Sequence, residues 1–216
     1  MKRFFSAIIL VALATICSAQ TTESFTTYLT LKQSGLNEST WNTNWSAGFL
    51  VPLYTTEKWS VQTGLEYQRL VMEGPVSFSI PAIYGLAQTE SDPGHGLMLY
   101  VQSTFRHAVG IGHFLLPLSA GVQYQRTGEI RMMAVDVSRT PYDPTLFVRV
   151  GTRRSTDVYG LALAAGVGYQ YPVTDWLGIQ AGVRFTLLQS FQELSGNSTE
   201  MPTGPVAVNY LFGITF

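Results

Sequence analysis

The feature that most constrains the fold is an alternation of apolar and polar residues with a period of two, strongest at the C-terminal end. Counting back from the last residue, every second position is apolar: Phe216, Ile214, Phe212, Tyr210, Val208 and Val206. The residues between them are mostly small or polar: Thr215, Gly213, Leu211, Asn209 and Ala207. Successive side chains of a β-strand point to opposite faces, so this pattern predicts a strand with one apolar face.

The same alternation recurs in seven further segments. They are 25–31, 45–53, 59–68, 97–106, 118–125, 159–170 and 177–187, with weaker signals in the first two. The connections alternate in length. Short ones fall at 55–58, 109–113 and 172–175, and long ones at 33–44, 70–96, 126–157 and 192–204. Eight strands with alternating short and long connections are typical of a transmembrane β-barrel, whose short turns lie on the periplasmic side.

The polar faces of these strands distinguish a membrane barrel from a soluble one. A soluble barrel or sandwich turns its apolar face inward and needs charged residues outside. Here only 12% of residues are charged, and the polar faces carry mainly Gln, Gly, Ser and Thr. We therefore predict an all-β fold, a closed antiparallel eight-stranded transmembrane β-barrel with long extracellular loops. A soluble secreted β-domain is the alternative. The net charge of −1 excludes a global basic field for nucleic acid.

The N-terminal segment has the features of an export signal. Lys2 and Arg3 precede an apolar run at 4–16, and small residues follow at 17–19. This run is too short to span a bilayer as a helix, and the pattern is typical of a secretory signal peptide. We predict a signal peptide at 1–19 and a barrel at 20–216. A lipid-anchored Cys17 is the alternative. Cys17 is the single cysteine, so we expect no disulfide in the exported protein.

Together, the signal peptide, the eight strands and the terminal Phe216 resemble the small outer-membrane β-barrel proteins of Gram-negative bacteria, of the OmpX and OmpA-barrel type. Four repeated units also resemble the porin-family barrels common in Bacteroidetes-type organisms: Gly64-Leu65-Glu66-Tyr67, Gly121-Val122-Gln123-Tyr124, Gly166-Val167-Gly168-Tyr169 and Gly182-Val183-Arg184-Phe185. The resemblance implies residence in the outer membrane and no shared enzymatic activity. It also implies that the barrel assembly machinery recognises the last strand, through Tyr210, Phe212, Ile214 and Phe216.

Two charges fall on predicted lumen positions at similar heights, Glu66 and Arg184. Counting from the periplasmic ends of their strands, we expect them to pair across the lumen. The pair is either a structural ion pair or part of a gate or proton path. The interior of an eight-stranded barrel is only wide enough for side chains, which disfavours a general diffusion pore.

Some small outer-membrane barrels modify lipid A with a Ser and a His, which makes the histidines of this chain candidate catalytic residues. Here His107 and His113 flank a predicted periplasmic turn, and His95 lies in a Gly- and Pro-containing loop. Ser103 and His107 are four residues apart on one strand face, too far for direct contact. We predict no catalytic, cofactor-binding or metal-binding residues and no cofactor.

The third long connection carries a cluster of arginines. Six lie between 126 and 156, against Glu129, Asp136 and Asp143: Arg126, Arg131, Arg139, Arg149, Arg153 and Arg154. Arginine suits bidentate contact with phosphate. Alternation at 130–137 and 145–150 predicts a hairpin that continues the barrel outward, with an edge open to strand addition. The cluster is predicted to contact lipopolysaccharide or a protein partner, or else only keeps the loop soluble.

The function these observations favour is a non-enzymatic outer-membrane barrel with a structural or interaction role, alone or as a subunit of a larger envelope complex. Its expected partners are outer-membrane lipid and lipopolysaccharide, the barrel assembly machinery and envelope proteins. The alternatives are an outer-membrane lipid-modifying enzyme and a narrow channel for small solutes.

Overall fold

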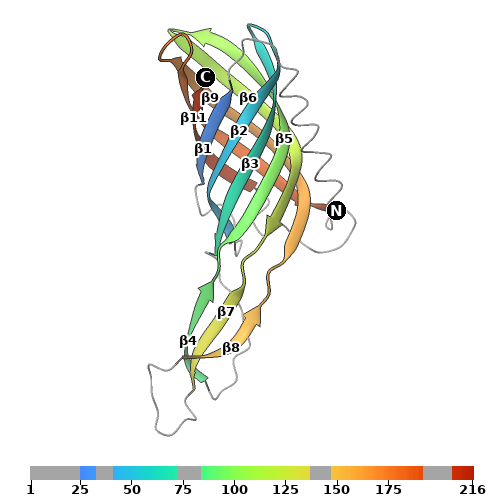
Figure 1. Ribbon diagram of the computed structural model, residues 1–216, viewed down its shortest axis with the longest axis vertical. Helices are drawn as coiled ribbons and strands as arrows, with labels where there is room; N and C mark the ends of the chain where they lie inside the picture. The colour runs from blue at the N-terminus through green and yellow to red at the C-terminus, as the bar shows by residue number, and fades with distance from the viewer. Residues whose placement is uncertain (1–24, 33–40, 73–83, 137–146, 192–205) are drawn as a thin grey trace.

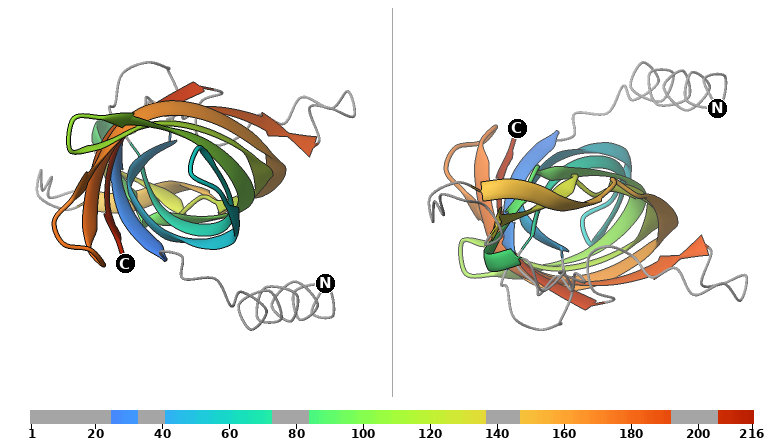
Figure 2. Two further views of the ribbon diagram at one scale, coloured as in Figure 1. Left: turned by 90° about the horizontal axis from the view of Figure 1, so that it is seen from above. Right: turned by 90° about the horizontal axis from the view of Figure 1, so that it is seen from below.

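The computed structural model describes residues 25–32, 41–72, 84–136, 147–191 and 206–216. Eight antiparallel strands close into a barrel, which confirms the predicted fold class (Figure 1). The barrel strands are β1 (Thr26–Lys32), β2 (Trp41–Thr55), β3 (Trp59–Met72), β5 (Gly94–Val109), β6 (Gly112–Arg126), β9 (Asp157–Pro172), β10 (Gly178–Ser190) and β11 (Val206–Thr215). Around the ring their order is β1-β11-β10-β9-β6-β5-β3-β2 (Figure 2).

The predicted signal peptide at 1–19 lies outside the described residues. Within the described part of the chain, no helix is long and apolar enough to cross a membrane.

The barrel closes between its first and last strands. Pairing runs from Thr26 with Thr215 to Lys32 with Asn209, and the Phe216 amide donates to the Phe25 carbonyl at 2.9 Å. The start of β1 and the end of β11 therefore lie at the same end of the barrel as the three short turns. In barrels of this kind that end faces the periplasm, so the opposite end is extracellular.

Exposure alternates along the strands as predicted. On β11, Phe212 is 53% exposed, and Phe216 just after the strand is 49% exposed, whereas Asn209 and Thr215 are buried. On β6, the outward positions are apolar from Phe114 to Val122. The stretch from Phe114 to Tyr124, at about 3.3 Å per residue on a strand tilted by about 40°, is about 25 Å tall, the height of a lipid-facing apolar band. The outer wall therefore suits lipid and not water.

The other three strands form a second sheet outside the barrel. They are β4 (Tyr84–Ser91), β7 (Ile130–Asp136) and β8 (Phe147–Arg153), in the order β4-β7-β8. β7 and β8 pair as the predicted hairpin, whereas β4 was not predicted. Each strand continues a neighbouring wall strand, namely β5, β6 and β9. The sheet thus extends one side of the barrel, and Figure 1 shows it projecting beyond the end opposite the C-terminus.

Backbone hydrogen bonds cross the junction between barrel and sheet. The Asp92 amide donates to the Glu129 carbonyl at 3.0 Å, and the Thr127 amide donates to the Thr156 carbonyl at 3.0 Å. Gly128 allows the close approach of these segments, because a Cβ added there would lie 1.9 Å from the Asp92 carbonyl oxygen. The junction is therefore a hydrogen-bonded continuation of the wall.

We expect Gly128→Ala to loosen the extracellular sheet while leaving the barrel closed, because the added methyl group forces Asp92 away from Glu129. Overpacking of this kind costs about 1 to 3 kcal/mol. Protease digestion of proteoliposomes measures the effect, with faster cleavage expected within the sheet and an unchanged membrane-protected core. Ser155→Ala, an exposed position on the same junction, is the control. Equal cleavage rates in the two variants would contradict the assigned role of Gly128.

Candidate functional site

An ion pair spans the centre of the lumen. Arg184 on β10 donates from Nη2 to both carboxylate oxygens of Glu66 on β3, at 2.7 and 2.9 Å. Both side chains are almost fully buried. Tyr28 Oη and Gln68 Nε2 also donate to the Glu66 carboxylate, at 2.8 and 3.1 Å. The carboxylate is thus saturated with donors, which is the condition for keeping a charge inside a barrel.

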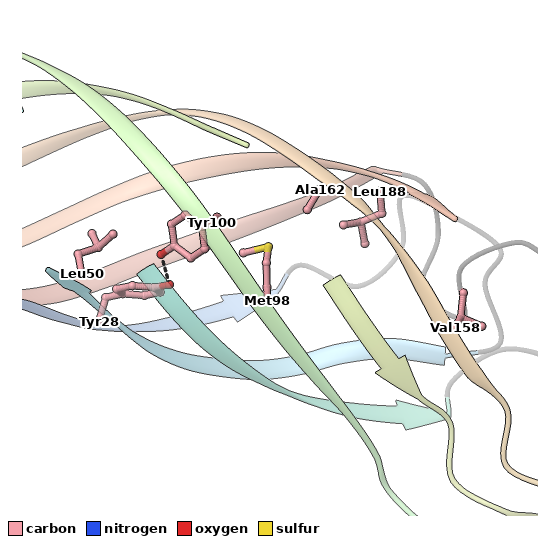
Figure 3. Packing of buried hydrophobic residues seen from close by; sticks show 7 residues of the cluster. All are labelled: Tyr28, Leu50, Met98, Tyr100, Val158, Ala162 and Leu188. Carbon is pink, nitrogen blue, oxygen red and sulfur yellow. Dashed lines mark hydrogen bonds between the residues drawn. The ribbon is translucent and has the colours of Figure 1, made fainter. Parts of the chain in front are cut away.

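Two tyrosines fill the lumen beside this pair. The hydroxyl groups of Tyr28 and Tyr100 are hydrogen-bonded to each other (Figure 3). Their rings lie over glycines of neighbouring strands. A Cβ added to Gly48 would be 2.5 Å from Tyr28 Oη, and one added to Gly64 would be 2.4 Å from Tyr100 Cζ. The glycine of the Gly64-Leu65-Glu66-Tyr67 unit therefore leaves space for the Tyr100 ring in the lumen.

The periplasmic half of the lumen contains a small cavity. The cavity has a volume of about 50 Å³, and Gln62, Gln102, Gln170, Arg106 and Arg184 are among the residues that line it. Nε of Arg184 is buried without a hydrogen-bond partner among the described residues. Polar walls and an unpaired donor suit a few water molecules.

An apolar cluster covers the extracellular mouth. Trp41 on β2, Leu70 on β3 and Ile130 on β7 are buried against each other, and Met72 packs beside them. The base of the extracellular sheet is thus anchored on the barrel rim. Sequence reasoning missed this cluster because its members come from three separate segments. The one sequence feature that could have indicated the cluster is Trp41, a large apolar residue within a predicted loop.

The arginine cluster is split between the barrel rim and the sheet. Arg126 lies on the outer rim, with Nε 3.7 Å from Asp157. Arg131 pairs with Asp92 at 2.7 Å and with Glu129 at 3.0 Å, and Arg149 also pairs with Glu129 at 2.8 Å. Arg139 lies outside the described residues.

Two arginines remain exposed at the end of β8, Arg153 and Arg154. Within the described part of the chain, neither forms an ion pair.

The ion pairs of Arg131 and Arg149 reduce the positive charge that the arginine cluster presents. The guanidinium groups of Arg131 and Arg149 hold the pKa of the Glu129 carboxyl below its ordinary value, with the Arg131 hydrogen bond as the main cause. Glu90 on β4 and Asp92 just after it add two carboxylates, so that residues 84–94, 126–136 and 147–157 contain five arginines and five carboxylates. The excess of positive charge is therefore cancelled over the whole sheet. The charges are nevertheless segregated, with Glu90 on β4 and Arg149 and Arg153 on β8.

The histidines and the predicted assembly residues lie on the outer surface. His107 and His113 are exposed at the periplasmic end, and His95 is exposed at the extracellular rim. Among the described residues, no group of three or more His, Cys, Asp or Glu could hold a metal ion. The predicted assembly residues are all exposed, three on β11 and one just after it: Tyr210, Phe212, Ile214 and Phe216.

A closed eight-stranded barrel with an apolar outer wall, a plugged polar lumen and long extracellular connections is the architecture of a small outer-membrane β-barrel protein of Gram-negative bacteria. The chain has the fold of this class, whose members lie in the outer membrane.

Comparison with solved structures gives likenesses in fold at low sequence identity. Ail, the attachment invasion locus protein of Yersinia pestis, is 11% identical, with a TM-score of 0.42 and coverage of 89% of this chain and 95% of Ail. The N-terminal barrel domain of Pseudomonas aeruginosa OprF is 12% identical, with a TM-score of 0.42 and coverage of 90% of this chain and 98% of the OprF domain. A major outer membrane protein from Thermus thermophilus is 10% identical, with a TM-score of 0.44 and coverage of 91% and 99%. No family model and no curated protein matches the chain.

Proposed function

We propose that this protein is a non-enzymatic interaction protein of the outer membrane, whose extracellular sheet β4-β7-β8 is its contact surface for another macromolecule. The observation that carries the proposal is the construction of this sheet. It extends a barrel wall, is anchored by the Trp41–Leu70–Ile130 cluster and is cross-linked by ion pairs of Arg131 and Arg149. A loop that merely connects two barrel strands needs none of these features.

The basic edge of the sheet is the best candidate for the contact. Among the strands that the structure describes, β8 pairs only with β7, so its other edge can accept an extended segment of a partner. Arg153 and Arg154 are exposed at the end of this strand. An edge strand flanked by free cations favours a partner segment that is extended and acidic.

Two variants test this edge without disturbing the sheet. Arg153→Gln/Arg154→Gln removes the free cations and spares the paired Arg131 and Arg149. Val150→Pro blocks the edge at the irregularity in the β7–β8 register, where Arg149 and Gly151 have partners on β7 and Val150 has none. Proline is tolerated at edge strands and bulges because no ladder hydrogen bond is lost there.

The measurement is quantitative mass spectrometry of proteins that co-purify with the full barrel in mild detergent, at low and moderate salt. We expect the amount of one co-purifying partner protein to fall at least tenfold with both variants. We also expect salt to weaken its association with the unmodified barrel more than its residual association with the arginine variant. Lys58→Gln, an exposed change in a periplasmic turn, is the control. Identical co-purifying proteins in all samples would contradict the proposal.

A further inference from the structure

A row of cationic side chains crosses the outer wall at its extracellular rim. Arg69 on β3 pairs in register with His95 on β5, His95 with Arg126 on β6, and Arg126 with Asp157 on β9. All four residues are exposed, on the lipid-facing side of their strands. We call Arg69, His95 and Arg126 the cationic row.

The cationic row lies immediately above the apolar band. One step toward the membrane, the outward residues in register across the same strands are Tyr67, Leu97, Tyr124 and Tyr159. Interfacial tyrosines mark the level where hydrocarbon meets headgroups in outer-membrane barrels. The cationic row is therefore at the height of the headgroups of the outer leaflet, below the extracellular sheet.

The aromatic step supports the row from below. Tyr67 lies between the rings of Trp45 and His95, with centroid distances of 5.8 Å to each. Its hydroxyl is hydrogen-bonded to Nδ1 of His95, which leaves Nε2 of His95 available to another group. The imidazole is thus oriented by its neighbour.

The charge of the row is only partly neutralised within the protein. Among the described residues, no carboxylate pairs with Arg69. Arg126 approaches Asp157 at 3.7 Å and donates to Ser155 Oγ at 3.4 Å, both long distances. The Asp157 carboxylate also accepts a 2.9 Å hydrogen bond from Tyr124 Oη.

We propose that the cationic row is a binding site for the phosphate group of an outer-leaflet lipid, with lipid A as the occupant. Neighbouring strands are about 4.8 Å apart, so the Cα atoms of Arg69 and Arg126 are about 10 Å apart with His95 between them. A phosphate placed over His95 is within reach of both guanidinium groups, which suit bidentate contact with phosphate oxygens. The acyl chains then lie along the apolar wall beneath. This site is independent of the β8 edge, because it faces lipid and lies on different strands.

The test is native mass spectrometry of the detergent-purified full barrel titrated with bisphosphorylated lipid A. We expect Arg69→Gln/Arg126→Gln to weaken binding at least tenfold. The matched control, Arg153→Gln/Arg154→Gln, loses the same charge above the membrane and is expected to stay within twofold of the unmodified barrel. Lipid A from which both phosphates have been removed is expected to bind the unmodified barrel as weakly as bisphosphorylated lipid A binds the row variant.

Three outcomes would overturn the proposal: equal binding by the row variant and the unmodified barrel, equal weakening by both double variants, and equally tight binding of dephosphorylated lipid A. The second would indicate a general field and the third recognition of acyl chains alone. Heat-modifiable gel migration reports folding of each variant. Should the double variant not fold, Arg69→Gln and Arg126→Gln singly carry the same test, with about threefold weakening expected for each. Loss of partner proteins from the β8 variants has no bearing on these results.

Discussion

Replacing Arg184 with alanine is expected to lower the free energy of unfolding of the barrel by about 3 kcal/mol. The reason is that Glu66 remains buried after its cationic partner is removed, although neutral donors such as Tyr28 and Gln68 still hydrogen-bond its carboxylate. The effect should be at the low end of the 3 to 5 kcal/mol typical of a broken buried pair. The cavity that Arg184 lines can admit water toward the carboxylate. Urea unfolding of the refolded barrel in lipid vesicles measures the change.

The control is the double variant Glu66→Gln/Arg184→Met, which removes both charges and keeps most of the volume. We expect it to recover most of the lost stability, because desolvation of two charges is avoided along with their attraction. If the double variant is as unstable as Arg184→Ala, the side chains matter through packing and not through pairing. Such a result would contradict the electrostatic role assigned to Glu66 and Arg184 in the plug.

Val183→Arg is expected to destabilise the barrel by about 2 to 4 kcal/mol, because it places a charge in lipid near the midplane. Val183 is the middle one of the five apolar outward positions on β10, between Ala181 and Phe185. Its register partners are Tyr210 and Val167, both on the outer wall. Snorkelling therefore has the greatest distance to cover at this position.

Gln180→Arg is the matched change on the other face of the same strand. Gln180 lines the lumen cavity near the periplasmic end, where an added guanidinium group meets polar walls. We expect it to cost less than about 1 kcal/mol in the same refolding assay, since the lumen face carries no lipid-insertion penalty. Equal destabilisation by the two variants would mean that the inner and outer faces are assigned wrongly.

Much of the barrel could be predicted because its rule is local. A strand between lipid and a polar lumen repeats every two residues, so β11 and β10 are readable without knowledge of the rest of the chain. Short periplasmic turns also fix the relative heights of strands. Counting from these turns places Glu66 and Arg184 at one level, and the structure brings them together.

Because only local alternation is visible in the sequence, two of the three strands of the extracellular sheet could be predicted. β7 and β8 alternate and form a hairpin, but β4 reads Tyr-Gly-Leu-Ala-Gln-Thr-Glu-Ser and has neither alternation nor an apolar run. It is a strand because it continues β5 and pairs with β7. Its one carboxylate, Glu90, and Asp92 just after it add negative charge beside arginines that lacked acidic partners in the loop sequence alone. The cationic row escaped notice because Arg69, His95 and Arg126 are brought into line only by strand register.

The one-sided extension of the wall bears on the order in which the protein assembles. β6, which leads into the centre of the extracellular sheet, stands four places from β1 in either direction around the ring. The tall side is thus diametrically opposite the β1–β11 seam, whose residues Thr26 and Thr215 are 189 positions apart in the chain. Pairings between such distant segments form late because a very long loop must close first. We therefore expect the projecting sheet to be complete while the cylinder is still an open ribbon with β1 and β11 as its two free edges. The extracellular contact surface would then be formed before the barrel closes and encloses its lumen.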